Sequence, residues 1–202
     1  MIGILDYGIG NPRSILRMCE TSGLEVTIVK NPAELEACGR LILPGVGHFD
    51  SCSRAIFNSG LGEAVMKNIS KSRMPILGIC VGAQLLGYTS EEGSCSGLEL
   101  LQMKTLALPV SGGSIPHIGW ETIEISEKSP LSGLFDENPR FYFTHSFSID
   151  AFNKSDVAAT FEFGQTLHAS VWSENVLAVQ FHPEKSHRFG RTLMEWFAHW
   201  KP

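Results

Sequence analysis

The residues best suited to chemistry are centred on Cys80, in the stretch Gly78-Ile-Cys-Val-Gly82. An apolar run, Ile76 to Ile79, precedes the cysteine, and the helix-favouring residues Ala83 to Leu86 follow it. A nucleophile with glycines two residues before and after it, between a strand and a helix, is the pattern of a nucleophile elbow. The sharp turn predicts a strained backbone at Cys80 and places the sulfur at a helix N-terminus, which favours the thiolate. The alternative is an ordinary buried cysteine, because free Cys packs like a small hydrophobic residue.

A candidate base, His182, stands at the end of the apolar strand Val176 to Gln180. Because Cys80 also ends a strand, both side chains are expected on the same rim of a sheet. Pro183 turns the chain there, and Glu184 can hydrogen-bond the imidazole and hold one tautomer. Considered alone, His182 would be interpreted as a histidine with its hydrogen bonds satisfied at the start of a loop. Glu184 alone would be interpreted as a solvent-exposed acidic residue. Beside an elbow cysteine, the two predict a Cys-His-Glu triad.

A glycine-rich turn, Pro44-Gly-Val-Gly47, follows another short apolar strand, and its backbone N–H groups are able to face the same site. Without Cys80, it would be interpreted as an ordinary strand-to-helix turn. A cysteine–histidine pair beside an oxyanion hole serves acyl transfer, in which the thiolate attacks a carbonyl and water then hydrolyses the thioester. We assign the oxyanion donors to the N–H of Val81 and to an N–H of the turn, at Val46 or Gly47.

The overall composition is that of an ordinary soluble globular protein. The 202 residues are 43% hydrophobic and 18% charged, which predicts a single domain over residues 1–202. The net charge of -5 gives no indication of nucleic acid or of an anionic membrane surface as partner. No apolar run approaches the roughly 18 residues needed to cross a bilayer, and the N-terminus has no basic signal-peptide region.

The cysteine and glycine patterns exclude several other sites. The five cysteines include no Cys-x-x-Cys pair, which fits a reducing cytoplasm and argues against both a disulfide framework and a metal site. The pair Gly8-Ile-Gly10 lacks the third glycine of a dinucleotide fingerprint, so we expect no cofactor there.

The first half of the chain alternates short apolar runs with helical patterns. We expect strands at 2–6, 24–29, 41–43 and 76–79, and helices at 12–22, 33–38, 49–58 and 61–71, with Asn11 as an N-cap before Pro12. This alternation predicts an α/β fold with a doubly wound, mostly parallel sheet. In such sheets the site lies outside the carboxyl ends of the strands, where Pro44–Gly47 and Cys80 both fall.

The second half of the chain does not continue this alternation of strands and helices. After loops at 90–97 and 111–114, short extended runs at 122–125, 140–144, 157–163 and 167–171 predict an added antiparallel portion rather than a separate domain. A helix over His187 to Trp200 closes the chain. Among the remaining histidines, only His145, directly after the 140–144 run, is expected to face the site. His117 has no such context.

Together the motifs resemble the class I (triad) glutamine amidotransferases. The resemblance rests on Pro44-Gly-Val-Gly, Gly78-Ile-Cys-Val-Gly-Ala-Gln and Val179-Gln-Phe-His-Pro-Glu-Lys185. A closer resemblance, to the glutaminase subunits of imidazole glycerol phosphate synthase, adds the stretches Asp6–Ser14, Pro116–Trp120 and Phe141–Ser146. It covers nearly the whole chain.

The resemblance implies a flavodoxin-like fold and hydrolysis of glutamine to glutamate and ammonia by Cys80, His182 and Glu184. It implies that Gln84 and Gly47 hold glutamine, that backbone around His145 and Ser146 binds its α-carboxylate, and that no metal or cofactor takes part. Ammonia would pass to a (β/α)8-barrel partner that makes imidazole glycerol phosphate and AICAR in histidine biosynthesis. Asn11, Tyr142 and Lys185 would lie toward that partner.

Departures from the family pattern keep other functions open. Pro12 and Phe147 replace an aliphatic residue and a tyrosine, and the stretch 99–114 lacks the usual Pro-Gly turn and arginine. One alternative is therefore a homologous glutaminase that feeds an amidination reaction of bacterial surface sugars. A second alternative is a Cys hydrolase of another amide or ester, but Gln84 favours glutamine as the substrate. A third is a catalytically inactive scaffold subunit, which the intact triad argues against. A redox sensor is weakened by the lack of an evident resolving cysteine.

Overall fold

The computed structural model describes the backbone of residues 1–202 and every side chain except that of Ser70. Its first half alternates strands and helices as predicted. The elements are β1 (Ile2–Leu5), α1 (Pro12–Thr21), β2 (Val26–Val29), α2 (Pro32–Leu35), β3 (Arg40–Gly45), α3 (Phe49–Asn58), α4 (Leu61–Ser72), β4 (Ile76–Cys80) and α5 (Val81–Leu85). Only α2 is clearly shorter than expected, because the chain turns early and the N–H of Gly39 already pairs with the carbonyl of Met1.

The second half is built mainly of strands. They are β5 (Met103–Ala107), β6 (His117–Thr122), β7 (Glu124–Ile125), β8 (Arg140–His145), β9 (Phe147–Ala151), β10 (Val157–Glu162), β11 (Thr166–Ser173) and β12 (Val176–Val179). Single 3-10 turns lie at η1 (Val110–Gly112), η2 (Lys154–Asp156) and η3 (Pro183–Lys185), and α6 (His187–His199) ends the fold. The sequence predicted neither β5 nor β9, and it placed only the end of β6.

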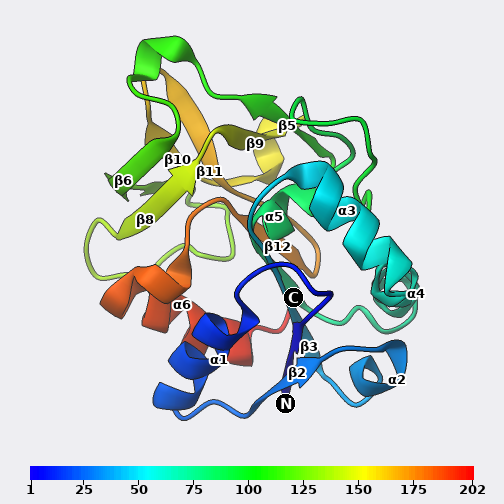
Figure 1. Cartoon of the computed structure of the whole chain (residues 1–202). Helices are drawn as coiled ribbons and strands as arrows, with labels where there is room; N and C mark the ends of the chain where they lie inside the picture. Colours follow the sequence, from blue (N-terminus) through cyan, green and yellow to red (C-terminus); the bar gives the residue numbers. More distant parts are fainter.

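One eight-stranded sheet, in the order β2-β1-β3-β4-β12-β11-β10-β7, runs through the molecule. Its first five strands are parallel, and β11, β10 and β7 continue it in antiparallel fashion. Figure 1 shows α1 and α6 on one face of the parallel part and α3, α4 and α5 on the other. This arrangement confirms the doubly wound, mostly parallel sheet with an antiparallel addition.

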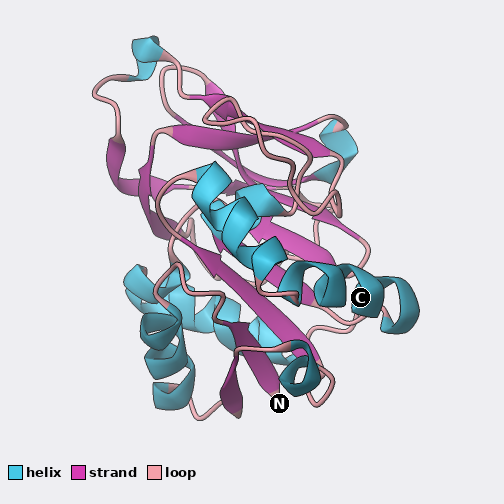
Figure 2. Ribbon diagram, turned by 45° about the vertical axis from the view of Figure 1, so that its right-hand side comes forward, coloured by secondary structure: helices cyan, strands magenta, loops and turns pink.

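Two small antiparallel sheets, β5-β9 and β6-β8, complete the added portion. Figure 2 shows that this portion lies at the end of the molecule opposite the N-terminus. In β6 the inward positions are His117, Gly119 and Glu121, so the strand lacks the apolar alternation that marks a half-buried strand in sequence. Its pairing with β8 settles its conformation.

Local signals and burial agree with the predicted elements. The side chain of Asn11 accepts a hydrogen bond from the N–H of Ser14 at 3.2 Å, and Pro12 is the first helical residue of α1. All five residues of β4 are buried, as a central parallel strand requires. All five cysteines are free thiols.

We searched the described residues for a membrane-spanning helix and for a metal-binding group of side chains, and found neither. Across the part of the chain that it describes, no helix is both long and apolar enough to cross a bilayer. Within the same described residues, no group of His, Cys, Asp and Glu side chains is placed to hold a metal ion.

Glycines allow α5 to pack directly on the backbone of β3 and β4. A Cβ on Gly82 would overlap the carbonyl oxygen of Leu43, and one on Gly78 would meet the backbone of α5. A Cβ on Gly45 would in turn overlap the backbone N of Gly82. Side chains at the two glycine positions flanking Cys80 would therefore collide with the neighbouring strand and helix.

We predict that Gly82→Ala lowers the free energy of unfolding by about 2–3 kcal/mol, because the new methyl group has only rigid backbone to displace. Gly39→Ala is the matched control, since a Cβ there meets nothing nearer than 3.9 Å, and it should stay within about 0.5 kcal/mol of wild type. Urea denaturation measures both. Equal stability of the two variants would contradict the close packing of α5.

Candidate active site

Cys80 ends β4 and stands directly before α5. Its backbone has φ +55° and ψ -116°, a conformation that a residue with a side chain adopts at a cost of about 1–3 kcal/mol. The side chain is 4% exposed. The strained turn predicted from the flanking glycines is therefore present, and it presents the sulfur at the carboxyl edge of the sheet.

His182 and Glu184 form a buried pair beside that edge. Nδ1 of His182 and Oε1 of Glu184 are 2.7 Å apart, and their side chains are 2% and 6% exposed. The N–H of His182 donates to the carbonyl of Tyr142 at 2.9 Å, and its carbonyl accepts from Oγ of Ser186 at 2.6 Å, so the backbone is fixed as well. A carboxylate only accepts hydrogen bonds, so Nδ1 carries a proton and Nε2 is the nitrogen left to react.

The environment of His182 favours its charged form. Burial by itself would lower its pKa, but the contacts with Cys80 and Glu184 outweigh burial and raise the pKa to about 9. At neutral pH the ring is therefore an imidazolium. Within the described structure Nε2 has no aligned hydrogen-bond partner, so its proton is available to the sulfur and to a bound molecule.

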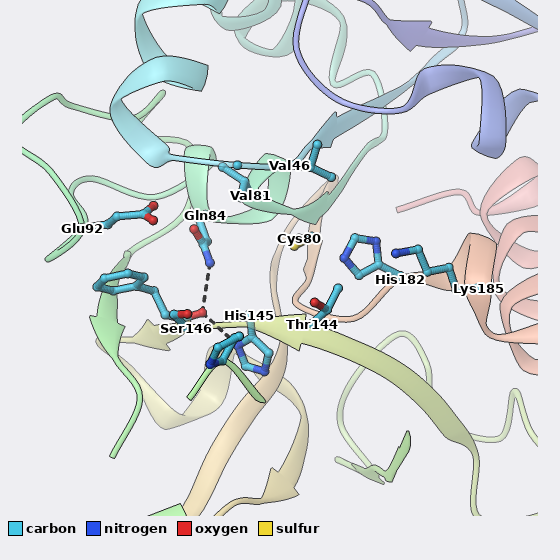
Figure 3. A pocket seen from close by; sticks show the side chains of 13 residues that line it. Val46, Cys80, Val81, Gln84, Glu92, Thr144, His145, Ser146, His182 and Lys185 are labelled. Carbon is cyan, nitrogen blue, oxygen red and sulfur yellow. Dashed lines mark hydrogen bonds between the residues drawn. The ribbon is translucent and has the colours of Figure 1, made fainter. Parts of the chain in front are cut away.

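A cavity of about 420 Å³ opens over Cys80, a size that suits a small ligand. It brings together nine of the residues singled out in the sequence: Val46, Gly47, Cys80, Val81, Gln84, His145, Ser146, His182 and Lys185. Figure 3 shows Cys80 between His182 and Gln84, with Glu92 beyond Gln84 at the far end of the cavity.

The other three candidates lie outside this cavity. Glu184 stands behind His182, as an orienting acid would. Tyr142 is covered by Lys185, whose Nζ is 5.4 Å from the centre of the ring. Asn11 caps α1 and borders a separate hollow near Arg13, so the structure does not bring it to the cavity.

Two side chains fix the turn after β3. The hydroxyl of Tyr7 donates to the carbonyl of Pro44 at 2.7 Å, and Sγ of Cys52 donates to the carbonyl of Val46 at 3.4 Å. Because the carbonyl and N–H of one planar peptide point in opposite directions, the N–H of Gly47 points away from Cys52. Gly47 itself has φ +91°, a conformation that favours glycine.

The side-chain amide of Gln84, which lines the cavity, is also fixed by hydrogen bonds. Its Nε2 donates to the carbonyl of Phe147 at 3.1 Å and to Oε1 of Gln180 at 3.2 Å. Among the described residues its Oε1 is buried without a partner. Since an unpaired buried acceptor is unfavourable, this oxygen is the atom on which a hydrogen-bond donor of a ligand would be stabilised.

Sequence reasoning missed Glu92. Its Oε2 accepts from the N–H of Phe49 at 2.7 Å, which joins its loop to the start of α3. Asp50 strengthens this junction by accepting from the N–H groups of Ser94 and Cys95 at 3.0 and 2.9 Å. An acidic residue in a Ser- and Gly-rich loop gives no sequence signal for this position, because only these long-range contacts place it.

His117 lies behind the cavity wall rather than in its lining. Its Nδ1 is 3.2 Å from Nε2 of His145, and its Nε2 is 3.0 Å from Oε1 of Glu121. The prediction that His145 faces the site holds, since it lines the cavity. The cross-strand register of β6 and β8 places the two histidines opposite each other, and this pairing could not be read from sequence without the strand β6.

The comparisons with known proteins agree with this geometry. The family described as "Glutamine amidotransferase class-I" matches residues 3–199, and the chain belongs to that family. It is therefore a glutamine-hydrolysing enzyme. A solved structure described as "Crystal structure of glutamine amidotransferase" has a TM-score of 0.78 at 22% identity and covers 98% of this chain and 97% of its own, which confirms the flavodoxin-like α/β fold.

Sequence relatives point to a particular subunit within the family. The chain is 41% identical over 198 residues to "Imidazole glycerol phosphate synthase subunit HisH 2" of Methanococcus maripaludis, with 98% of each chain covered. It is also 41% identical over 202 residues to "Imidazole glycerol phosphate synthase subunit HisH" of Leptospira borgpetersenii, with 98% of this chain and 99% of the relative covered.

The raised pKa of His182 predicts how Cys80 reacts with iodoacetamide. Because the imidazolium beside the sulfur persists to about pH 9, wild-type Cys80 should be alkylated faster at about pH 7 than a free cysteine. In His182→Asn the rate at about pH 7 should fall roughly tenfold and then rise with pH, since a free cysteine is only a few per cent thiolate at neutral pH.

Peptide mass spectrometry after timed alkylation measures this rate. His199→Asn, at an exposed position of α6, is the matched control and should behave as wild type. An unchanged rate at neutral pH in His182→Asn would show that the imidazolium does not activate Cys80.

Proposed function

We propose that this chain is the glutamine-hydrolysing subunit of an imidazole glycerol phosphate synthase. The observation that carries the proposal is the preformed arrangement of the elbow Cys80 with the buried His182–Glu184 pair, 2.7 Å apart, at one cavity. The high identity to subunits of that synthase supports the same assignment. We propose further that residues 1–202 act as one domain in the cytoplasm, without a metal or cofactor.

The reaction follows from the positions of the side chains. The thiolate of Cys80 attacks the carboxamide carbon of glutamine, and the N–H groups of Val81 and Gly47 stabilise the oxyanion. One such donor is worth about 3–4 kcal/mol. The imidazolium of His182 gives its Nε2 proton to the leaving ammonia, which leaves a γ-glutamyl thioester. Neutral His182 then takes a proton from the water that hydrolyses the thioester, and glutamate is released.

The rest of the cavity fits a zwitterionic amino acid. The carboxylate of Glu92, at the end of the cavity away from His182, would bind the α-ammonium group together with the unpaired Oε1 of Gln84. Backbone N–H groups around His145 and Ser146 would bind the α-carboxylate. Such complementary charges fix the orientation of the substrate, so that its carboxamide lies at Cys80.

A partner would dock beside the cavity. The outer face of β6 and β8 carries Ile118, which is 60% exposed, and Trp120, which stacks on His187 with ring centres 5.3 Å apart. Tyr142 and Lys185 continue this face to the cavity. Partly exposed aromatic groups beside an exposed apolar residue are typical of protein interfaces. Asn11 would contact the same partner from the N-terminus of α1.

Ammonia chemistry favours such a partner. Free ammonia is protonated in water and loses its nucleophilicity, so a docked synthase that receives it directly avoids this loss. We propose a (β/α)8 barrel that uses the ammonia to form imidazole glycerol phosphate and AICAR in histidine biosynthesis.

Glutamate release from glutamine, by the chain alone and with the barrel subunit and its acceptor ligand, tests this function. We expect release to be stimulated at least about tenfold by the barrel and its ligand. Cys80→Ala should lose glutamine-dependent product formation at the barrel but keep ammonia-dependent formation, because the barrel's own chemistry does not need the thiol.

Two outcomes would contradict the assignment. Release that this barrel does not stimulate would contradict the pathway while leaving the glutaminase. Loss of the ammonia-dependent reaction in Cys80→Ala would mean that Cys80 supports the structure of the complex rather than the chemistry.

The division of roles within the triad predicts unequal effects of substitution. Glu184→Gln should lower kcat about 10- to 100-fold, because the amide oxygen still accepts from Nδ1 of His182 but lacks the charge that favours the imidazolium. His182→Ala removes the proton donor itself and should lower kcat about a thousandfold or more. Steady-state glutamate release measures both, and equal losses would contradict the orienting role of Glu184.

A further inference from the structure

The loop of residues 91–96 contributes the acidic end of the cavity. Its Glu92 lines the cavity at the end away from His182. No helix or strand of the described structure includes residues 91–96, so no regular ladder of backbone hydrogen bonds fixes the loop. A side chain on such a loop keeps one position only if a rigid neighbouring element holds the loop. The contacts of this loop therefore decide where the carboxylate of Glu92 lies.

Asp50, at the start of α3, is the centre of these contacts. Its Oδ1 accepts from the N–H of Ser94 at 3.0 Å and from that of Cys95 at 2.9 Å, so one oxygen fixes two successive peptide groups. A Cβ on Gly93 would overlap this oxygen, so the close approach needs a glycine there. The N–H of Cys95 holds the pKa of Asp50 below its ordinary value, and the carboxylate is therefore charged at neutral pH. Asp50 itself does not line the cavity.

Two further hydrogen bonds join the loop to the same helix. Oγ of Ser53 donates to the carbonyl of Ser96 at 2.6 Å, and the N–H of Phe49 donates to Oε2 of Glu92 at 2.7 Å. Within the described structure, every hydrogen bond from residues 92–96 to a helix or strand goes to α3. Because Oε2 of Glu92 is used in this way, Oε1 is the atom that is left for a ligand.

In the proposed binding mode, glutamine meets separate parts of the cavity. Its carboxamide lies at Cys80, and its α-carboxylate lies at the backbone around His145 and Ser146. Its α-ammonium group lies at the carboxylate of Glu92 and Oε1 of Gln84. Of these groups only Glu92 is carried by the loop, and its attraction for a cation falls as the distance between the charges grows. A shift of the loop would therefore weaken binding of the α-ammonium group and leave the other contacts in place.

We propose that Asp50 is a positioning residue for substrate selectivity: it fixes the loop of residues 91–96, and through the carboxylate of Glu92 it sets the preference of the cavity for amides that carry an α-ammonium group. The inference rests on the proposed function, because it concerns how the same cavity recognises glutamine. Asp50 lies outside the cavity lining, so its effect is on binding of the α-ammonium group rather than on the chemical step.

Three variants of the chain, each in complex with the barrel subunit and its acceptor ligand, test the proposal. Asp50→Ala removes the acceptor for both N–H groups of the loop, and we expect KM for glutamine to rise about tenfold while kcat stays within about twofold of wild type. Asp50→Asn keeps an acceptor oxygen, so its KM should stay within about threefold of wild type. Glu63→Ala is the matched control, because it removes an exposed acid from the first turn of α4, and it should leave both constants unchanged.

Glutaramate, which is glutamine without its α-ammonium group, separates this subsite from the rest of the cavity. Its Ki as a competitive inhibitor of glutamine hydrolysis should agree within about twofold between wild type and Asp50→Ala, because it has no ammonium contact to lose. Three results would overturn the role in selectivity. They are a KM for glutamine in Asp50→Ala within about twofold of wild type, an equal rise of this KM and of the Ki for glutaramate, and an equal rise of KM in Asp50→Asn and Asp50→Ala.

Amide hydrogen exchange in the chain alone supplies a second measurement that needs no activity. Mass spectrometry of peptides that cover residues 90–97 should show faster exchange in Asp50→Ala than in wild type, and Asp50→Asn should stay close to wild type. Equal exchange in wild type and Asp50→Ala would show that Asp50 does not hold the loop and would overturn the inference. No glutamate release by the wild-type complex would instead overturn the proposed function, whatever the exchange shows, and with it any role toward glutamine.

Discussion

The close packing of α5 against the backbone of β3 and β4 is the constraint on which the site depends. It is possible only because Gly45, Gly78 and Gly82 carry no side chain at the points of contact. The chain therefore leaves β4 through a single residue, Cys80, whose positive φ directs the sulfur out of the sheet edge. The N–H of Val81, the turn after β3 and the cavity all take their positions relative to that residue.

Around the turn at Cys80, hydrogen bonds hold the buried polar side chains but leave one atom of His182 and one of Gln84 without a partner in the described structure. Glu184 is paired with His182, so that Nε2 of the ring is left for the reaction. Gln84 is paired through its NH₂ group, so that its oxygen is left for a ligand. Because an unpaired buried polar atom is costly, binding of a complementary ligand is favoured at these two atoms.

Charge is distributed along the same cavity. The imidazolium of His182 and the ammonium of Lys185 lie toward one end, and the carboxylate of Glu92 lies toward the other. The loop that carries Glu92 is anchored by Asp50, whose pKa is lowered by the N–H of Cys95. Long-range anchoring of this kind lets a loop residue serve in a site built on a sheet edge.

The sequence predicted the features that depend on local signals. The elbow was predicted by glycines two residues on either side of Cys80, and the His182–Glu184 pair by a strand end followed by Pro183. The parallel half was predicted by alternating apolar runs and capping residues such as Asn11. Each of these requires contacts only between near neighbours in the chain or follows from a general rule of sheet topology.

The features that sequence did not predict depend on partners far along the chain. Strand β6 has inward His117, Gly119 and Glu121, and only pairing with β8 identifies it as a strand. Because the sequence analysis placed only the end of this strand, it did not predict the contact between His117 and His145. Glu92 was missed for a similar reason, because Phe49 and Asp50, which position its loop, lie more than forty residues away.

The most direct test of the central claim is the site of covalent capture by a glutamine analogue. The wild-type chain, with its partner, would be incubated with the electrophile 6-diazo-5-oxonorleucine, and peptide mass spectrometry would locate the adduct among the five cysteines. The account predicts an adduct on Cys80 alone, with protection by excess glutamine. Modification of Cys52 or the more exposed Cys95 in its place, or labelling that glutamine does not suppress, would contradict it.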